Sequence, residues 1–157
     1  TQLAYDPLLS EEQIRKMGAT KVELDTLLRQ SDVVSLHAPS LDSTYHMINR
    51  DALESMKTGA ILINTARASL VDQDALVDAL KTGKLKYACI DVYEQEPLNE
   101  DCPLRQLPNC IMTPHIAGAA NNGKKKIGAH VLAEIRRFVN GEELVSEITP
   151  EMLATMA

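Results

Sequence analysis

Three side chains with complementary chemistry follow three short apolar segments of the sequence: Arg67, Glu96 and His115. Each apolar segment is typical of a buried strand, and the carboxyl ends of parallel strands meet at one edge of a sheet, where ligands bind. An arginine at such an edge can hold an anion, a histidine can donate a proton, and an acid beside the histidine favours the imidazolium form. The sequence therefore predicts a catalytic group of residues at this edge.

The elements that would position these side chains alternate along the chain. Short β-like segments and helical patterns follow one another, which is typical of βαβ units and a parallel sheet. Strands are expected at residues 2–5, 21–22, 33–36, 61–64, 87–91 and 110–113, and helices at 11–17, 24–29, 51–56, 73–81 and 123–139, with a last turn at 151–156. We therefore predict an α/β fold with a doubly wound parallel sheet of the Rossmann type.

The composition narrows the class of protein. The 157 residues carry a net charge of −6, and the lysines at 124–126 are the one basic cluster, which argues against a nucleic acid or membrane partner. No apolar stretch approaches the roughly 20 residues that cross a bilayer. The three cysteines are odd in number and follow no metal-binding spacing, so we expect no metal, reduced thiols and a cytoplasmic location.

Asp6 ends the first expected strand and precedes Pro7. An acid at the end of the second strand of a Rossmann fold accepts hydrogen bonds from the adenosine ribose, which would favour NAD over NADP. The alternative is a turn residue, which is the more frequent role of an Asp before a Pro.

The glycine fingerprint that accompanies such an acid lies about 20 residues upstream of it, which is before Thr1. We therefore expect the chain to lack the first strand and the glycine-rich loop. In the strand order 3-2-1-4-5-6 the first strand is central, so its absence would expose strand edges on both sides of a gap. We expect either that a second chain pairs with the strand edges at this gap, or that the 157 residues belong to a longer polypeptide.

Four motifs resemble one family of proteins: SDVVSLHAP at 31–39, NTAR at 64–67, DVYEQEP at 91–97 and TPHIAG at 113–118. With the segment around Asp6, they make residues 5–141 similar to the cofactor domain of the D-isomer-specific 2-hydroxyacid dehydrogenases. The resemblance implies that Arg67 binds the substrate carboxylate and polarises its 2-oxo group. It also implies that His115 is the general acid/base of an NAD-dependent hydride transfer, and that Glu96 supports His115.

The same resemblance assigns cofactor contacts and a domain organisation. The implied NAD contacts are Asp6, His37, Ala38, Pro39, Thr44, Thr65, Ala66, Arg67, Asp91, His115 and Gly118. Residues 1–141 would form a partial dinucleotide-binding domain, and residues 142–157 a tail that crosses back to an absent substrate domain. The expected protein is a homodimer that acts on a small 2-oxo or 2-hydroxy acid, and the 157 residues alone are expected to be inactive.

The sequence departs from the family pattern at two places, and two other functions stay open. Ala68 stands where a glycine is usual, so its backbone should suit an L-residue, and residues 121–123 (NNG) replace the usual start of the following helix. Residues 118–124 (GAANNGK) match the first positions of a phosphate-binding loop, but Lys125 follows where a hydroxyl is needed. The alternatives are this nucleotide binder and an NAD-sensing module that binds a protein partner.

Overall fold

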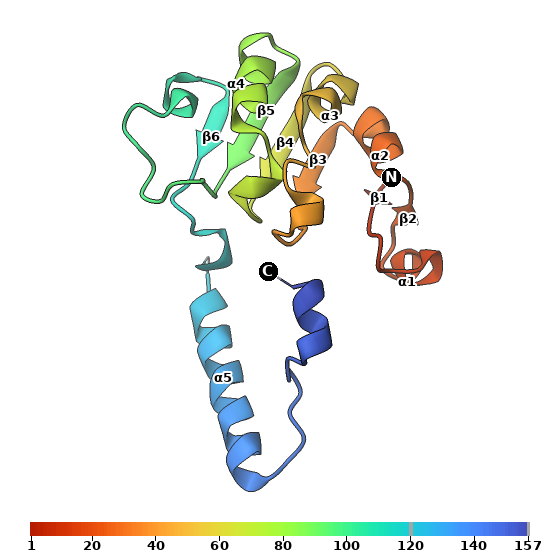
Figure 1. Cartoon of the computed structure of the whole chain (residues 1–157), viewed down its shortest axis with the longest axis vertical. Helices are drawn as coiled ribbons and strands as arrows, with labels where there is room; N and C mark the ends of the chain where they lie inside the picture. The colour runs from red at the N-terminus through yellow and green to blue at the C-terminus, as the bar shows by residue number, and fades with distance from the viewer. Residues whose placement is uncertain (120, 157) are drawn as a thin grey trace.

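The computed structural model describes residues 1–119 and 121–156 and has an α/β architecture in which every paired strand is parallel (Figure 1). The main sheet has the order β3-β4-β5-β6, and a separate pair of strands is formed by β1 and β2. The strands are β1 (Leu3–Ala4), β2 (Thr20–Lys21), β3 (Val33–Leu36), β4 (Ala60–Asn64), β5 (Leu85–Ile90) and β6 (Cys110–Met112). The predicted fold class is confirmed.

Helices α2 (Leu24–Gln30), α3 (Arg50–Ser55) and α4 (Gln73–Lys81) pack on the main sheet (Figure 1). Asn49 and Asp72 cap α3 and α4, because their side chains accept the N–H groups of Ala52 and Ala75. Alternate residues of β4 face these helices, so that Ala60 and Leu62 are buried and Ile61 and Ile63 are only half-buried. The core therefore lies between this sheet face and the helix layer.

The two sheets are separated where the central strand of a doubly wound fold would lie. A cavity of about 880 Å³ occupies this place, and its walls include Gln2 and Leu3 on one side and Val33, Val34 and Ser35 on the other. The short helix α1 (Glu11–Lys16) joins β1 to β2 beyond the cavity. The expected break in the sheet is therefore present.

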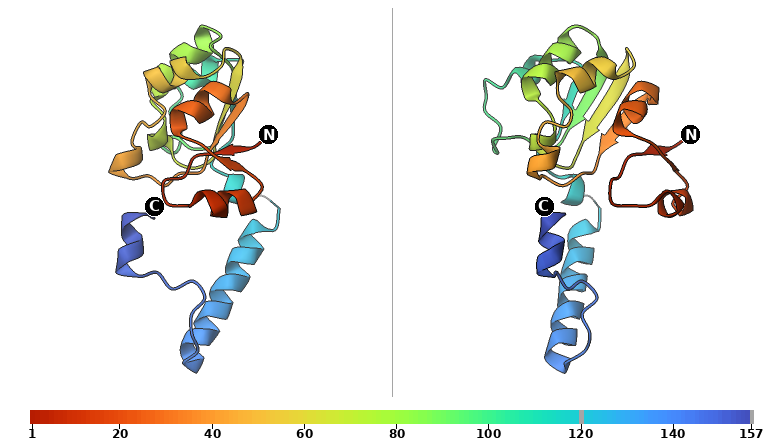
Figure 2. Two further views of the ribbon diagram at one scale, coloured as in Figure 1. Left: turned by 90° about the vertical axis from the view of Figure 1, so that its right-hand side faces the viewer. Right: turned by 45° about the vertical axis from the view of Figure 1, so that its right-hand side comes forward.

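Helix α5 (Gly123–Asn140) leads away from the sheet as an arm, and the chain then turns back beside it (Figures 1 and 2). Gly141 ends α5 in the left-handed conformation, with φ of 68°. Apolar side chains of the arm are exposed; those on α5 are Ile127, Val131, Leu132, Ile135, Phe138 and Val139. No helix among the described residues is long and apolar enough to cross a membrane.

The predicted elements differ from the observed ones mainly at their ends. Strand β1 is shorter than predicted, because it pairs on one side only. Strand β5 begins at Leu85 and ends before Asp91, whose carboxylate bonds to the loop after β6. The predicted last turn is a 3₁₀ helix at Pro150–Ala154.

Candidate active site

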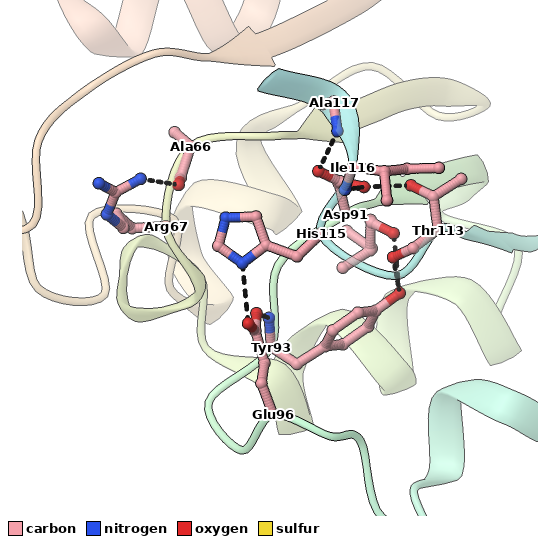
Figure 3. A network of polar contacts seen from close by, with 10 residues as sticks. Ala66, Arg67, Asp91, Tyr93, Glu96, Thr113, His115, Ile116 and Ala117 are labelled. Carbon is pink, nitrogen blue, oxygen red and sulfur yellow. Dashed lines mark hydrogen bonds and ion pairs between the residues drawn. The ribbon is translucent and has the colours of Figure 1, made fainter. Parts of the chain in front are cut away.

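The three predicted catalytic residues follow β4, β5 and β6, so all three lie at the carboxyl edge of the main sheet. In the view of Figure 3, the imidazole of His115 is drawn between the guanidinium of Arg67 and the carboxylate of Glu96. This is the edge at which ligands of open parallel sheets bind. The geometry of each turn decides what the three side chains can do there.

His115 and Glu96 form a direct pair. Glu96 Oε2 lies 2.8 Å from His115 Nδ1, and Glu96 Oε1 accepts the backbone N–H of Tyr93 at 3.0 Å. These two hydrogen bonds hold the pKa of Glu96 below its usual range. Because Nδ1 is the atom that faces the acid, Nε2 is the nitrogen left to exchange a proton with a ligand. The imidazole side chain is 51% exposed, so a ligand can reach it.

Asp91 is buried directly behind this pair. It is 2% exposed, and its Oδ1 accepts the Thr113 hydroxyl and, at 2.9 Å, the N–H of Ile116. Its Oδ2 accepts the N–H of Ala117, also at 2.9 Å. Burial alone would raise the pKa of Asp91, but the three hydrogen bonds outweigh burial and the net direction is downward. The predicted nicotinamide contact therefore has both carboxylate oxygens bonded within the protein.

Tyr93 connects the turn after β5 to the turn after β6. Its hydroxyl is 2.9 Å from the carbonyl oxygen of Ile90 and 3.0 Å from that of Thr113 (Figure 3). Its backbone N–H is the group that holds Glu96. One residue therefore connects the end of β5 to the loop that carries His115.

The turn that carries Arg67 is built on Asn64, the last residue of β4, which is 2% exposed. The Asn64 amide donates to the carbonyl of Arg67 at 2.9 Å and accepts the N–H of Ala66 at 3.1 Å. The guanidinium of Arg67 donates to the carbonyl of Ala66 at 2.7 Å, and within residues 1–119 and 121–156 no acidic side chain forms an ion pair with it. Its remaining donors are available for an anion.

Ala68 follows this turn and begins a 3₁₀ helix, Ala68–Leu70. Among the described residues, the non-glycine positions with positive φ are His46, His115 and Asn121, so Ala68 is not one of them. The backbone at the expected departure from the family pattern thus suits an L-residue, as predicted.

Six predicted site residues line one cavity of about 360 Å³ at this edge: His37, Ala38, Pro39, Thr65, Ala66 and Arg67. Thr155 from the returning tail lines it as well. The lining is mainly polar and includes imidazole, hydroxyl and guanidinium groups. Thr44 shapes the loop nearby, because its hydroxyl donates to the carbonyl of Pro39 at 2.7 Å and accepts the N–H of Leu41.

His115 and Glu96 line a second cavity, of about 470 Å³. Tyr93, Leu98 and Arg105 also contribute to its walls, with Pro97, Met112, Thr113 and Pro114. The predicted triad therefore meets at one edge of the sheet, but Arg67 and His115 face different cavities within it.

Asp6 and Gly118 lie outside these two cavities. Asp6 Oδ1 accepts the N–H groups of Leu8 and Leu9 at 2.8 and 3.1 Å, which is the geometry of the alternative turn role. Gly118 lies in the 3₁₀ helix Ala117–Ala119. A Cβ atom at Gly123 would come within 2.6 Å of the Gly118 carbonyl oxygen, so the glycine at the start of α5 is required for this close approach.

Sequence reasoning missed the supporting roles of Asn64, Tyr93 and Thr113. Asn64 is a polar residue at the end of an apolar strand, and this was a usable signal, because a buried amide must bond to something nearby. Tyr93 and Thr113 gave no comparable signal, since the bond from Tyr93 to Thr113 and the bond from Thr113 to Asp91 join residues that are 20 and 22 positions apart in sequence.

Comparison with known proteins shows which family this chain resembles in sequence. Residues 1–117 match the family model described as "D-isomer specific 2-hydroxyacid dehydrogenase, NAD binding domain". The chain is 40% identical to D-3-phosphoglycerate dehydrogenase of Archaeoglobus fulgidus over 139 residues, which are 88% of this chain and 26% of that protein. It is 42% identical to glyoxylate reductase of Korarchaeum cryptofilum over 140 residues, 89% of this chain and 42% of that protein.

Two solved structures have a similar fold. Apo D-mandelate dehydrogenase of Rhodotorula graminis has a TM-score of 0.83 at 34% identity, covering 94% of this chain and 43% of that chain. D-lactate dehydrogenase of Lactobacillus jensenii with NAD⁺ has a TM-score of 0.83 at 31% identity, covering 94% of this chain and 48% of that chain. The chain thus spans less than half the length of the relatives it matches.

Proposed function

The chain belongs to the D-isomer specific 2-hydroxyacid dehydrogenase family, whose NAD-binding domain it matches over residues 1–117, and from this premise we propose that the complete natural protein reduces a small 2-oxo acid to a D-2-hydroxy acid. The observation that carries the proposal is the His115–Glu96 pair, 2.8 Å apart, at the same sheet edge as an arginine without an acidic partner among the described residues. Relatives of this chain are named as glyoxylate reductase and D-3-phosphoglycerate dehydrogenase.

Arg67 binds the carboxylate of the 2-oxo acid through its planar fork of donors and withdraws electron density from the adjacent carbonyl. His115 donates the Nε2 proton to the carbonyl oxygen during reduction and takes it back during oxidation. Glu96 accepts a hydrogen bond from Nδ1, which fixes the ring and stabilises the imidazolium before the proton leaves. Each of the three residues thus acts on a different atom.

NADH supplies the hydride when it is bound. His37, Ala38, Pro39, Thr65 and Ala66 would hold the nicotinamide half against Arg67, since these residues line one cavity with it. Asp91 would lie behind this site, and Gly118 and Thr44 would shape its loops. Asp6 would accept the ribose hydroxyls through Oδ2, because Oδ1 already caps the turn at Leu8.

The test is a panel of 2-oxo acids with NADH and with NADPH on the complete protein. We expect reduction of at least one small 2-oxo acid with NADH and slower reduction with NADPH. Absence of turnover with every 2-oxo acid in the panel would contradict the proposal. A preference for NADPH would contradict the role of Asp6 alone.

The 157 residues by themselves are proposed to be inactive, because they span only 26% and 42% of two relatives. Residues 1–141 would then be part of a dinucleotide-binding domain, and residues 142–157 would cross to a further domain. Activity of the isolated 157-residue chain equal to that of the complete protein would contradict this.

A homodimer is the proposed assembly, supported by the exposed apolar side chains of α5. Lys124, Lys125 and Lys126 begin this helix, whereas Glu142, Glu143 and Glu147 follow its end. Two antiparallel copies would bring the basic start of one helix beside the acidic end of the other. Sedimentation velocity on the complete protein should give a dimer, weakened by Ile135→Lys and unaffected by Arg136→Gln at the neighbouring position.

A further inference from the structure

We propose that Asp91 is the positioning residue for His115: its buried carboxylate fastens the backbone on both sides of the histidine and thereby sets the direction of the imidazole. This inference rests on the proposed function, in which His115 is the proton donor. It differs from the expected cofactor contact, because Asp91 here acts through the histidine loop.

The contacts of Asp91 enclose His115 in the sequence. Thr113 bonds to Asp91 from two positions before the histidine, and the N–H groups of Ile116 and Ala117 bond to it directly afterwards, at 2.9 Å each (Figure 3). The loop therefore wraps around one carboxylate, with His115 at the top of the turn.

His115 itself adopts a conformation that needs such support. Its φ is +51°, in the left-handed region that only a few per cent of non-glycine residues occupy. Its N–H donates to the carbonyl of Thr113 at 3.1 Å, which closes the turn tightly. Without the anchor, the loop would relax toward ordinary backbone angles, and the imidazole would turn away from Glu96.

A carboxylate suits this position better than an amide. Three donors converge on the side chain, and an ionised carboxylate is an acceptor at both oxygens. An asparagine would point its NH₂ group at one of these donors in either orientation. The lowered pKa of Asp91 agrees with this, since it keeps the group ionised through the neutral range.

The neighbouring residues explain why the effect should reach the chemistry. Tyr93 bonds to the carbonyl of Thr113 and also holds Glu96 through its N–H. One set of hydrogen bonds therefore holds both Glu96 and His115. Within this set, Asp91 fixes the backbone conformation of His115.

The experiment compares Asp91→Asn, Thr113→Val and Thr113→Ser in the complete protein. Four quantities are measured: kcat, the Kd for NADH, the melting temperature, and the downfield proton resonance of the His115 imidazole N–H that bonds to Glu96, assigned by its loss in His115→Gln. We expect Asp91→Asn to lower kcat by about 100-fold, as misplacement of a catalytic group by about 1 Å does. The Kd for NADH should stay within about twofold, because both carboxylate oxygens of Asp91 bond to the histidine loop.

Thr113→Val removes one of the three hydrogen bonds, so we expect a loss in kcat of about tenfold and a weakened imidazole resonance. Thr113→Ser keeps the hydroxyl and should restore both. This pair decides the question even where Asp91→Asn fails to fold, because the two substitutions leave the Asp91 carboxylate and both N–H bonds in place.

Three results would overturn the inference. One is Asp91→Asn with weaker NADH binding and an unchanged imidazole resonance, which would make Asp91 a cofactor contact. The second is a lower melting temperature with unchanged kcat and resonance, which would make it a purely structural residue. The third is Thr113→Val indistinguishable from Thr113→Ser. The resonance is independent of turnover, so an unmodified protein that reduces no 2-oxo acid would refute the proposed function and leave this test intact.

Discussion

The turns around Arg67 and His115 occupy the same edge of the sheet and are built on different buried groups. The Arg67 turn rests on the neutral amide of Asn64, and the His115 turn rests on the carboxylate of Asp91, each 2% exposed. A second acid, Glu96, contacts the histidine. An arginine that must bind a substrate carboxylate is best supported by a neutral group, because a nearby acid would compete for it. A histidine that must carry a proton gains from flanking acids.

The largest expected effect comes from removing the proton donor. His115→Ala in the complete protein should lower kcat by about 10²–10⁴-fold, which is the usual range for a general acid. His130→Ala is the matched control, because His130 lies on α5 and bonds to Ser146. Near-native turnover of His115→Ala in steady-state kinetics would show that the proton comes from elsewhere.

Removing the guanidinium of Arg67 should weaken substrate binding as well as turnover. Arg67→Ala should lower kcat/KM for the 2-oxo acid by about 10²–10³-fold, since charge-assisted hydrogen bonds contribute about 1.5–3 kcal/mol each. Arg50→Ala serves as the control, because Arg50 pairs with Asp78 on the surface. A change in KM alone, with kcat intact, would limit Arg67 to substrate binding.

Giving the Arg67 turn a buried acid, like the one in the His115 turn, should destabilise it. Asn64→Asp replaces the amide by an acceptor, so the carbonyl of Arg67 loses its donor and a negative charge is buried near the guanidinium. We expect a loss of about 1–3 kcal/mol in the free energy of unfolding and a raised KM. Urea denaturation and kinetics at neutral pH measure both. An unchanged KM would mean that the neutrality of this turn has no role in binding.

The smallest change removes only the charge of Glu96. Glu96→Gln should lower turnover, because the imidazole loses the carboxylate that bonds to Nδ1 and fixes the ring. The lowered pKa of Glu96 also fixes the sign for stability. The pair contributes above the ordinary pKa of a glutamate and is lost as the pH falls through the lowered value, so the two proteins should converge in acid. Melting curves at several pH values test this, and a difference that grew with acidity would contradict it.

The sequence was sufficient to predict that Arg67, Glu96 and His115 meet at one sheet edge, because strand ends and parallel topology determine it. It was also sufficient for helix α4, whose predicted limits, residues 73–81, agree with the structure. It was insufficient for the anchoring of the histidine loop. The bonds from Asp91 reach residues 22 to 26 positions away, and they depend on how β5 and β6 pair.

The same limit applies to Asp6. Its position predicted a ribose contact or a turn, and only three-dimensional structure could show that Oδ1 caps the turn at Leu8 and Leu9. Local hydrogen bonds of this kind depend on the backbone angles of the next few residues, which Pro7 alone does not determine.

The cavity between β1 and β3 also separates the β1–β2 pair from the main sheet. The two parts should therefore unfold separately. Within residues 1–119 and 121–156, strands β1 and β2 pair only with each other, and a two-stranded unit is marginal in water. Amide hydrogens such as those of Thr20 and Val22, which bond to Gln2 and Ala4, should exchange with solvent much faster than those of β4. A strand that filled the cavity would join the two parts into one folding unit, and protection of these amides would report it at a distance from His115.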